Sequence, residues 1–549
     1  MRRDFADARF GQIHYRIIEP KAPRGKPVVL FHQSPSSGRP FEHLMAALGT
    51  DRTVIAPDTP GFGDSDPPPS PPTIADYAAA MGDFLDALGL KEIDAFGDHT
   101  GAKVAVELAR QRPNQIRRLV LNAAPVYSDT KMAEMMAHLE DEKPKPPPAD
   151  GSHLLKRWQG MRKWYPADIP DDLFERDFYE GLRGLDLAWY GHNAAFAYSH
   201  AEALPALAQP VLILCPDDGL WEATQAARPH LKNGRIHELP DWKMGAVSTR
   251  AVEMAAIVRS FLDGPHASLT AGAPKPAPVK ATIAPRAIRK RFVATRSGQV
   301  LARVVTPTSA KARPIVCLHM SPVSGRNFEP LLAELGRDRI AVALDLPGFG
   351  ESDAPPKPPS MADLAAYMVE AIQQLGLATP IDMYGDHTGA CVAIEMAVTY
   401  PTLVRRFALN TVPFFDADQR RERLAHARHE PGKADGSHLP EMWARMTRLT
   451  APTLGRMAIE RNLVESTRGG PFGHWGHGAV FSYVMDGVLP RITQPVLVFR
   501  PRDGLEEHTA RALTLMTTAK LHDLPRDRYG FVEERPSEFA KLIREHCDD

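Results

Sequence analysis

The sequence predicts an α/β protein with two tandem doubly wound sheets, each carrying a helical cap insert. Three observations lead to this fold class. The 549-residue chain consists of two similar halves. Each half alternates short apolar runs with amphipathic stretches, and a long insert interrupts that alternation. Alternating strands and helices are typical of a parallel sheet that is covered by helices on both faces.

The duplication covers whole domains. HQSPSSGRPFEHL at His32 returns as HMSPVSGRNFEPL at His319, and FGDHTGAKVAVELA at Phe96 returns as YGDHTGACVAIEMA at Tyr384. The offset between the copies changes by only a few residues, so the repeat is not a short motif. We therefore predict a first domain over 1–263 and a second over 286–549. Residues 264–285, rich in Pro, Ala and Lys, are predicted to be an extended linker.

Within the first copy, the strands are predicted from short apolar runs bounded by Pro, Gly or Asp. Unalternating runs suit strands that are buried on both faces, as in a parallel sheet. Two stretches between them carry apolar residues at helical spacing, Ile74–Leu88 and Ala102–Arg110. The predicted strands are Val28–His32, Val54–Ala56, Ile93–Phe96, Leu119–Leu121 and Val211–Cys215.

Two inserts, about 126–205 and about 413–490, interrupt the alternation of predicted strands and helices and are rich in proline and aromatic residues. We interpret each as a mobile helical cap over a ligand pocket, because α/β sheets bind ligands beyond the carboxyl ends of their strands. The alternative is a helical layer that only covers the edge of the sheet.

Composition restricts the partners. Lys+Arg 66 against Asp+Glu 67 leaves a net charge of -1, which is unlike a nucleic-acid-binding protein. No apolar run approaches the roughly 20 residues that span a bilayer, and no secretory signal is visible. Four widely spaced cysteines favour a reducing, cytoplasmic location. We expect a small-molecule substrate, no nucleic acid or membrane partner, and a possible homo-oligomer.

The segment Gly97-Asp98-His99-Thr100-Gly101 lies between a predicted strand and a predicted helix. This is the context of a G-x-nucleophile-x-G elbow. Together with the His-containing loop at His32, the D-x-PGFG-x-S loop from Asp58 and the P-V-L-x-x-x-P-x-D segment from Pro210, it makes each half of the chain resemble the α/β-hydrolase superfamily. The resemblance extends over nearly all of each half.

The resemblance also identifies where this chain departs from the family. The elbow residue, which is Ser, Cys or Asp in the family, is His99 in the first half and His387 in the second. Asp218 and Asp503 fit the position of the family acid. The position of the family's catalytic His is occupied by Met244 and Tyr529. Neither half therefore carries the Ser-His-Asp order.

Our first interpretation makes the two elbow histidines the chemical centre. Each imidazole would pair with its Asp, which fixes the tautomer and raises the basicity of the other ring nitrogen. Such a dyad could activate water, abstract a proton from a substrate, or attack an acyl carbon directly. The resemblance places an oxyanion hole at the backbone N–H groups of Ser34 and Thr100, and of Ser321 and Thr388 in the second half.

Two other interpretations remain open. Each half repeats four histidines that could bind a metal with nearby aspartates: His32, His99, His153 and His192, matched by His319, His387, His438 and His477. Alternatively, the domains are catalytically silent ligand-binding or scaffolding modules, because fold does not fix function.

We predict a cofactor-independent and metal-free hydrolase of a small, partly hydrophobic ester, lactone or C–C bond next to a carbonyl. A non-hydrolytic lyase, decarboxylase or isomerase is the alternative within enzymes. Arg39 and Arg326 could bind a substrate carboxylate through two hydrogen bonds, or could equally be ordinary salt-bridged residues at the start of a helix. The histidines of the inserts could face a substrate or form hydrogen bonds within the cap. The predicted substrate-binding residues are Arg39, His153, His192, Arg326, His438 and His477.

Overall fold

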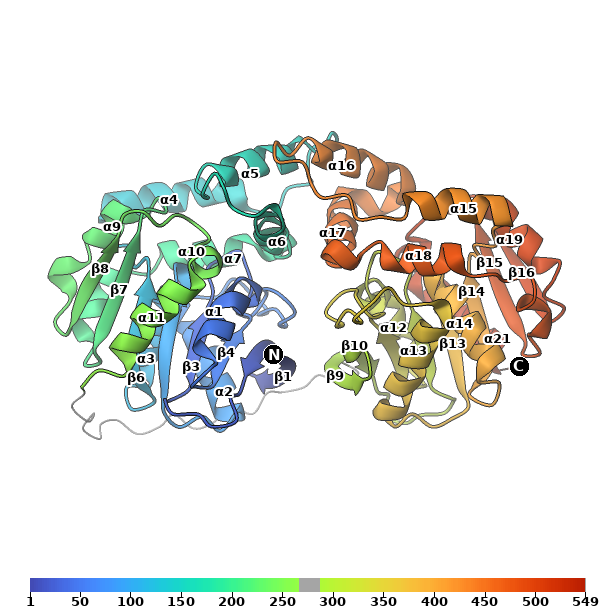
Figure 1. The fold of residues 1–549 in the computed structure, drawn as a ribbon, viewed down its shortest axis with the longest axis horizontal. Coiled ribbons are helices and arrows are strands. Elements are labelled where there is room, and N and C mark those ends of the chain that lie inside the picture. The colour runs from blue at the N-terminus through green and yellow to red at the C-terminus, as the bar shows by residue number, and fades with distance from the viewer. Residues whose placement is uncertain (266–286, 549) are drawn as a thin grey trace. The chain divides into compact units, whose positions relative to one another are not determined.

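The computed structural model of the protein describes residues 1–265 and 287–548, apart from the side chains of 140–142. They form two compact units (Figure 1). The first comprises Met1–Lys145, Leu154–Ile283 and Ala434–Gly436, and the second Pro146–His153, Ala284–Lys433 and Ser437–Asp549. The predicted linker, 264–285, lies outside the described residues from 266 onward, and the predicted domain boundaries stay predictions.

The first unit is built on an eight-stranded sheet in the order β1-β2-β4-β3-β5-β6-β7-β8. The pairs β1/β2 and β2/β4 are antiparallel, and all other neighbours are parallel. The strands are β1 (Arg2–Ala8), β2 (Gly11–Ile18), β3 (Val28–Phe31), β4 (Val54–Pro57), β5 (Ile93–Asp98), β6 (Ile116–Asn122), β7 (Val211–Pro216) and β8 (Gly234–Leu239).

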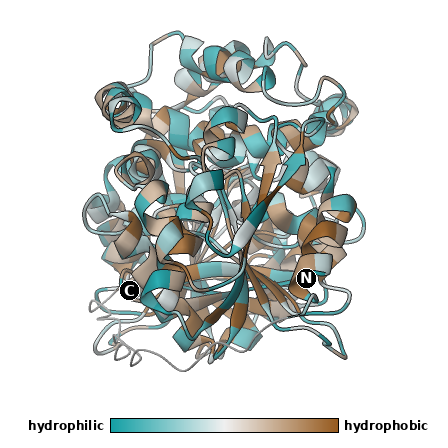
Figure 2. Ribbon diagram, turned by 90° about the vertical axis from the view of Figure 1, so that its left-hand side faces the viewer, coloured by the Kyte–Doolittle hydropathy of each residue, from teal (hydrophilic) through white to brown (hydrophobic). Residues whose placement is uncertain are grey.

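Helices cover both faces of this sheet because successive strand residues point to opposite sides. Val29 and Phe31 pack with α2 (Ile74–Ala87) and α3 (Thr100–Gln111) on one face. Their neighbours in β3 pack on the other face with helices α1 (Glu42–Leu48), α10 (Ala246–Thr249) and α11 (Ala251–Leu262). α9 (Trp221–Gln225) follows β7. In Figure 2 the strands are largely brown, while the surrounding helices mix teal and brown, as amphipathic helices should.

An insert of five helices separates β6 from β7. Its first helix starts at a serine N-cap, Ser128, whose side chain accepts from the N–H of Lys131. The helices of the insert are α4 (Asp129–Glu142), α5 (Ser152–Arg162), α6 (Asp171–Leu182), α7 (Trp189–Phe196) and α8 (His200–Ala203).

The second unit repeats the architecture, with strand order β16-β15-β14-β13-β11-β12-β10-β9. Its strands are β9 (Arg289–Thr295), β10 (Gly298–Val305), β11 (Ile315–Leu318), β12 (Ala341–Leu344), β13 (Ile381–Asp386), β14 (Val404–Asn410), β15 (Val496–Pro501) and β16 (Ala519–Leu524). Its helices are α12 (Glu329–Leu335), α13 (Met361–Leu375), α14 (Thr388–Thr399), α19 (Glu506–Leu513), α20 (Phe531–Glu534) and α21 (Pro536–Asp548). The insert between β14 and β15 holds α15 (Ala417–His426), α16 (His438–Leu449), α17 (Gly455–Thr467) and α18 (Trp475–Ser482).

The sequence ADGSHL occurs twice, at 149–154 and at 434–439, and each copy serves a structural purpose inside a unit. In the first unit Trp158 Nε1 donates to the carbonyl of Ala434 at 2.9 Å, and in the second Trp443 Nε1 donates to the carbonyl of Ala149 at 2.9 Å. Both indole rings are buried. Their indole N–H groups therefore hold a loop in place in each unit.

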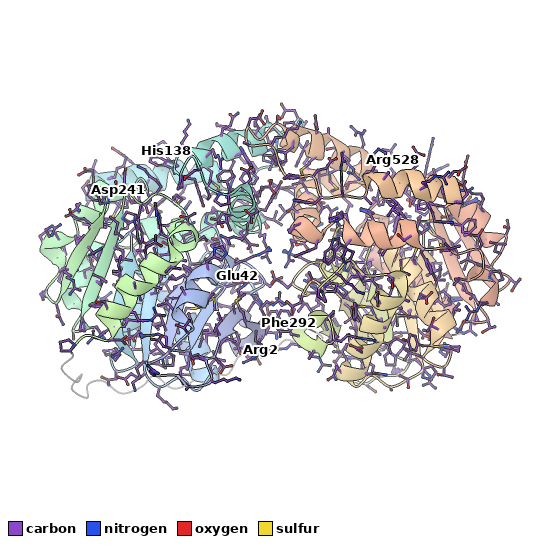
Figure 3. The ribbon with its side chains drawn as sticks, viewed as in Figure 1. Arg2, Glu42, His138, Asp241, Phe292 and Arg528 are labelled. Carbon is purple, nitrogen blue, oxygen red and sulfur yellow. The ribbon has the colours of Figure 1, made fainter. Side chains whose placement is uncertain are left out.

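The predicted fold class is confirmed, because each unit contains a mostly parallel sheet between helical layers. Every predicted strand of the first copy is present. The sequence missed β1, β2 and β8, whose residues are mixed in polarity and lie toward the sheet edges. Polar side chains of these outer elements form ion pairs, as between Arg16 Nε in β2 and Glu42 Oε1, which is labelled in Figure 3 (3.1 Å). No helix among the described residues is both long and apolar enough to cross a membrane.

Candidate functional site

The elbow between the central strand and the next helix is a strained turn in both units. β5 ends at Asp98 and α3 begins at Thr100, and His99 between them has φ 50° and ψ −107°. His387 has φ 48° and ψ −102° at the same place between β13 and α14. Residues with side chains rarely adopt this conformation, so its presence twice marks a position that the surrounding structure enforces.

The flanking glycines are required by the close approach of the backbone. A Cβ at Gly97 would collide with the carbonyl oxygen of Gly101, and a Cβ at Gly101 would collide with the carbonyl oxygen of Phe31. The second unit has the same constraint at Gly385 and Gly389. The GDHTG segment is therefore dictated by the turn as well as by any chemistry at its centre.

The His99 ring pairs with the predicted acid and keeps one nitrogen open. Nε2 lies 2.8 Å from Oδ2 of Asp218, which is itself buried, and 4.0 Å from Oδ1 of Asp98. Asp218 is fixed in turn by the N–H of Leu220, which donates to its Oδ1 at 3.1 Å. Among the described residues no group hydrogen-bonds to His99 Nδ1, and the side chain is 16% exposed.

This pairing sets the charge of the ring. Burial acts to lower the pKa of His99, but the charge and the hydrogen bond of Asp218 outweigh burial and raise the pKa to about 9. At neutral pH the ring is therefore mainly an imidazolium. Its base form, with a lone pair on Nδ1, becomes abundant only as the pH approaches about 9.

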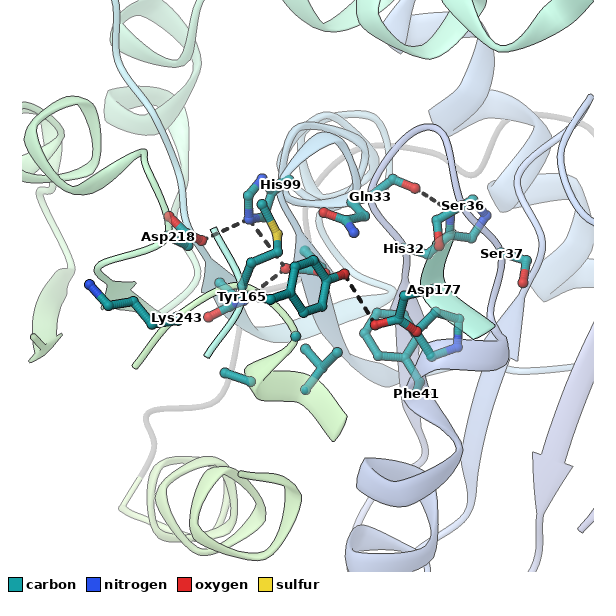
Figure 4. A pocket seen from close by; sticks show the side chains of 17 residues that line it. His32, Gln33, Ser36, Ser37, Phe41, His99, Tyr165, Asp177, Asp218 and Lys243 are labelled. Atoms are coloured by element: carbon teal, nitrogen blue, oxygen red, sulfur yellow. Dashed lines mark hydrogen bonds and ion pairs between the residues drawn. The ribbon is translucent and has the colours of Figure 1, made fainter. Parts of the chain in front are cut away.

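His99 lines two cavities. The larger, about 260 Å³, is lined by His99, Asp218 and Met244 together with aromatic and polar residues: Ser34, Thr100, Lys103, Pro125, Tyr127, Met135, Trp164, His192, Ala195, Phe196, Gly219 and Leu220. The smaller, about 20 Å³, is shown in Figure 4, where the His99 ring is directed at Asp218. Tyr165 forms part of the wall of this smaller cavity, and its hydroxyl donates to Asp177 at 3.2 Å.

The His387 ring has partners at both nitrogens. Nδ1 donates to Oδ1 of Asp386 at 2.5 Å, and Nε2 lies 2.9 Å from Oδ2 of Asp503, an ion-pair distance. Tyr529 stacks on the ring, with centroids 5.0 Å apart and planes at 25°. Burial opposes charge on this ring, but the Tyr529 hydroxyl and the two carboxylates outweigh it and raise the pKa of His387 well above its usual value.

The His387 ring contacts Asp386, its neighbour in the chain. Because His99 has nearly the same backbone conformation, this contact reflects the orientation of the His387 ring and not the turn itself. Asp386 is held in place by Asn410, whose Nδ2 donates to Oδ1 at 2.7 Å. In the first unit Asn122 donates to Asp98 in the same way, yet the His99 ring stays at 4.0 Å.

The second unit has a larger cavity, about 390 Å³, but His387 is not among the residues that line it. Tyr529 and Asp386 face the cavity instead. Basic side chains gather at its wall, including Arg445, His474 and His477. Burial, Arg445 and the charged His387 lower the pKa of His477 to about 4, so this ring is neutral at neutral pH.

The four residues assigned to the oxyanion holes lie beside the elbows, but their surroundings differ. Ser34 and Thr100 both line the 260 Å³ cavity. In the second unit the N–H of Ser321 donates to Oγ1 of Thr388 at 3.3 Å, so this amide already has an acceptor. A Cβ at Gly191, in α7, would collide with the Ser34 side chain, so glycine lets the insert approach this loop.

Of the predicted substrate-binding residues, two line cavities. His192 lines the 260 Å³ cavity and stacks on Phe196 at 5.3 Å. His477 lines the 390 Å³ cavity and stacks on Phe481 at 5.9 Å.

The structure gives the two arginines ion-pair partners. Arg39 Nη1 lies 3.3 Å from Oε1 of Glu180, and Arg326 Nη1 lies 3.3 Å from Oε1 of Glu465. Both glutamates are buried and also accept from serine hydroxyls, Ser37 and Ser324, at 2.6 Å. Neither arginine is among the residues lining the 260 or 390 Å³ cavities.

His153 and His438 also lie outside the walls of these two cavities. His153 Nε2 is 3.1 Å from Oε1 of Glu460, and His438 Nδ1 accepts from the N–H of Lys433 at 3.0 Å. These residues belong to the repeated ADGSHL segments, whose structural role the sequence did not reveal.

The four histidines considered as metal ligands do not meet. His32 uses both ring nitrogens for backbone contacts, with the carbonyl of Gln33 at 2.6 Å and the N–H of Thr59 at 2.8 Å. Within the described ranges, the only group with three or more candidate ligand atoms within 4.8 Å of one another is His14, Asp58 and Asp64. Asp58 and Asp64 are neighbours of Arg16 and Arg183, respectively, so both carboxylates have cationic partners.

Sequence reasoning missed Lys103. Its side chain is 3% exposed, it lines the 260 Å³ cavity, and its Nζ donates to the carbonyls of Ala195 and Tyr198 at 2.8 Å each. The signal was present in the repeat, because GDHTGAK in the first copy becomes GDHTGAC in the second, with Cys391 at the same position.

Comparison with known proteins gives a family match in both halves. A family model described as alpha/beta hydrolase fold matches residues 26–215 and 313–429, which together make up more than half of the chain. An uncharacterized protein of Mycobacterium tuberculosis is 33% identical over 132 residues, 24% of this chain and 39% of that protein. Haloalkane dehalogenase 2 of the same species is 31% identical over 116 residues, 21% of this chain and 39% of its own length.

Two further similarities concern named hydrolases. The 2-hydroxy-6-oxo-2,4-heptadienoate hydrolase of Pseudomonas putida is 35% identical over 104 residues, 18% of this chain and 38% of its own length. Among solved structures, the enol-lactonase of Burkholderia xenovorans aligns with 47% of this chain and 100% of its own, at 21% identity and a TM-score of 0.41. The chain thus spans about two fifths of the length of the curated relatives it matches.

Proposed function

Because the chain belongs to the alpha/beta hydrolase fold family, we propose that its first unit is a cofactor-independent hydrolase with His99 as its catalytic base. The substrate is a small, partly hydrophobic molecule with an ester, a lactone or a C–C bond next to a carbonyl. The observation that carries the proposal is the placement of His99. One ring nitrogen is 2.8 Å from Asp218, and the ring lines a cavity of about 260 Å³.

The base form of the dyad supplies the chemistry. When His99 is neutral, Nε2–H donates to Asp218, which leaves the lone pair on Nδ1. Water in the cavity attacks the substrate carbonyl and gives its proton to Nδ1. As the tetrahedral intermediate collapses, Nδ1–H returns that proton to the leaving group. General base catalysis of this kind contributes roughly 10²–10⁴-fold to a rate.

The backbone N–H groups of Ser34 and Thr100 are the proposed oxyanion donors. Both residues line the same cavity as His99, which supports this assignment. Donors of this type act on the charge that develops on the carbonyl oxygen in the transition state. In the second unit the N–H of Ser321 is already bonded to Thr388, so the corresponding pair is less available there.

The experiment is turnover of a panel of p-nitrophenyl esters, aryl lactones and vinylogous 1,5-diketones by wild type and His99→Gln. We expect hydrolysis of at least one member and a loss of roughly 100-fold or more in kcat/KM in the variant. Reaction in ¹⁸O-labelled water must place the label in the acid product; a product without label would instead favour a lyase or isomerase. A serine-directed fluorophosphonate should not label the protein, because the elbow carries no hydroxyl.

For the second unit, one observation favours a different function. His387 is held by two carboxylates, is covered by Tyr529 and is absent from the wall of the 390 Å³ cavity. We therefore propose that this unit binds a ligand without hydrolysing it. The test is His387→Gln, which should retain the hydrolytic activity of the protein; a loss equal to that of His99→Gln would place chemistry in both units.

A further inference from the structure

The first cavity contains a buried amine that the proposed hydrolysis does not use. Lys103 lies one helical turn after His99 in α3, and its side chain is almost fully buried. Its Nζ donates to two backbone carbonyls in the insert, those of Ala195 and Tyr198. In the described part of the chain, no carboxylate lies within ion-pairing distance of this nitrogen. A buried lysine without a carboxylate partner is unusual, because burial strongly disfavours an isolated charge.

Among the described residues, none of the groups around Lys103 provides a counter-ion. Burial lowers the pKa of its amine to about 7. The nearby Glu107 is already engaged by Tyr198 at 2.9 Å and by Arg110 at 2.7 Å. His200 is neutral, because burial and the charge of Lys103 lower its pKa to about 3. The other polar groups at this end of the cavity are Tyr127, with its ring centroid 5.9 Å from Nζ, Tyr198 at 6.0 Å, His192 and the His99–Asp218 pair.

The hydrogen bonds that Lys103 already makes determine which ligand group it can still bind. A neutral amine has two N–H groups, and the two carbonyls use both. When the amine takes up a proton, it gains a third N–H without an acceptor among the described residues. The cavity that Lys103 lines offers space for such an acceptor. An anionic oxygen placed there would both accept this hydrogen bond and neutralise the charge.

We infer that the 260 Å³ cavity binds organic carboxylates, and that Lys103 holds the carboxylate as a third hydrogen-bond donor while taking up a proton. This inference deepens the proposed hydrolysis, on which it rests, by making the substrate a small organic acid that carries its ester, lactone or ketone away from the carboxylate. The aromatic walls at Tyr127 and Phe196 fit the apolar part of such a molecule. Cys391 has no charge to offer at the equivalent position, so this property belongs to the first unit.

The test compares a carboxylate with its neutral amide, using phenylacetate and phenylacetamide as probes. Calorimetric titrations of the full chain at slightly alkaline pH, in two buffers of different ionisation enthalpy, give affinity and proton uptake together. We expect phenylacetate to bind roughly ten-fold or more tightly than phenylacetamide, as a charge-assisted hydrogen bond implies. It should also take up a substantial fraction of a proton, whereas phenylacetamide takes up none. His99, already protonated there, cannot provide that uptake.

Two variants complete the test. Lys103→Met should lose both the preference and the proton uptake. Lys131→Met, which removes an exposed lysine, should keep both. Equal binding of the two probes, absence of proton uptake by wild type, or retention of both properties in Lys103→Met would each overturn the inference. If Lys103→Met does not fold, Lys103→Gln replaces it and must lose the proton uptake, because His192 also lines the cavity and wild-type uptake alone does not identify the proton acceptor.

Phenylacetate cannot be hydrolysed, so its binding tests the role of Lys103 independently of the turnover that tests the proposed hydrolysis. A protein that prefers phenylacetate but hydrolyses no panel member keeps the binding site and refutes the proposed function. A protein that hydrolyses esters through His99 without any preference for the carboxylate keeps the function and refutes the role of Lys103.

Discussion

The two elbow histidines share a backbone conformation but not a chemical environment. Both rings emerge from the same strained turn, with φ near 50°, and both reach an aspartate at the end of the seventh strand of their sheet, Asp218 or Asp503. Only His387 also donates to its chain neighbour, Asp386. One hydrogen bond therefore separates a ring with an available nitrogen from a ring whose two nitrogens are both occupied.

On the proposed functions, the duplicated fold preserves the elbow histidine while changing its use. The imidazole in the second unit lies buried between two carboxylates, an arrangement that needs no substrate. In the first unit the ring has one carboxylate, a Met244 neighbour in place of a stacked Tyr529, and direct access to a cavity. Identity at the elbow is thus weaker support for shared chemistry than the partners of the ring.

The largest expected effect comes from replacing the paired acids. In Asp218→Asn, an amide can donate to His99 Nε2 and so shift the ring proton to Nδ1, where the lone pair is needed. We expect kcat/KM for ester hydrolysis to fall by roughly 100-fold or more. In Asp503→Asn we expect a change of less than about three-fold, because His387 lies outside the proposed reaction.

Thermal unfolding of both Asn variants provides the control, since each removes a buried ion pair. If the two variants lose activity equally while keeping similar melting temperatures, the comparison is wrong and both units catalyse.

The second prediction is a pH profile. A base with a raised pKa must lose its proton before it can act, so kcat/KM should rise about ten-fold per pH unit below the His99 pKa of about 9 and level off above it. His387→Gln should leave the profile unchanged. A profile that levels off near the ordinary histidine pKa, about 6.5, would show that Asp218 does not control the reacting ring.

The fold class and the central strands could be predicted because their determinants are local and repeated. Unalternating apolar runs such as Val211–Cys215 and the GDHTG turn specify buried strands and a glycine-dependent elbow, and the duplication provided each signal twice. β8, by contrast, was missed because its side chains are largely exposed, which leaves no apolar run to detect.

The site was only partly predictable, because its chemistry depends on distances that spacing does not encode. The sequence indicated the pairs His99–Asp218 and His387–Asp503, and both pairs lie within 2.9 Å. It could not show that Arg39 is engaged by Glu180, because the glutamate lies 141 residues away in an insert helix. Nor could it show that Asp386 accepts a hydrogen bond from Nδ1 of His387, because this contact depends on a difference in ring orientation between two nearly identical turns.

A third prediction measures the asymmetry directly by NMR titration of the histidine rings. Asp386→Asn should lower the pKa of His387 by about one unit or more, because it removes the charge and replaces a charge-assisted hydrogen bond with a neutral one. Asp98→Asn should lower the pKa of His99 by less, because that carboxylate is 4.0 Å from the ring and Asp218 provides the main stabilisation. Shifts of equal size would mean that the two neighbours act alike.

The smallest expected effect tests whether the stacked tyrosine is what keeps His387 inactive. Tyr529→Met gives the second unit the residue found at Met244, and it opens the face of the ring toward the 390 Å³ cavity. Since Nδ1 would still donate to Asp386, we expect the hydrolytic rate of a His99→Gln, Tyr529→Met double variant to stay within about two-fold of His99→Gln alone. Adding Asp386→Ala, which leaves no side-chain acceptor, releases that nitrogen and should give the first measurable rate in this background. Recovery of activity by Tyr529→Met alone would instead make the aromatic cover, rather than the Asp386 hydrogen bond, the feature that distinguishes the two units.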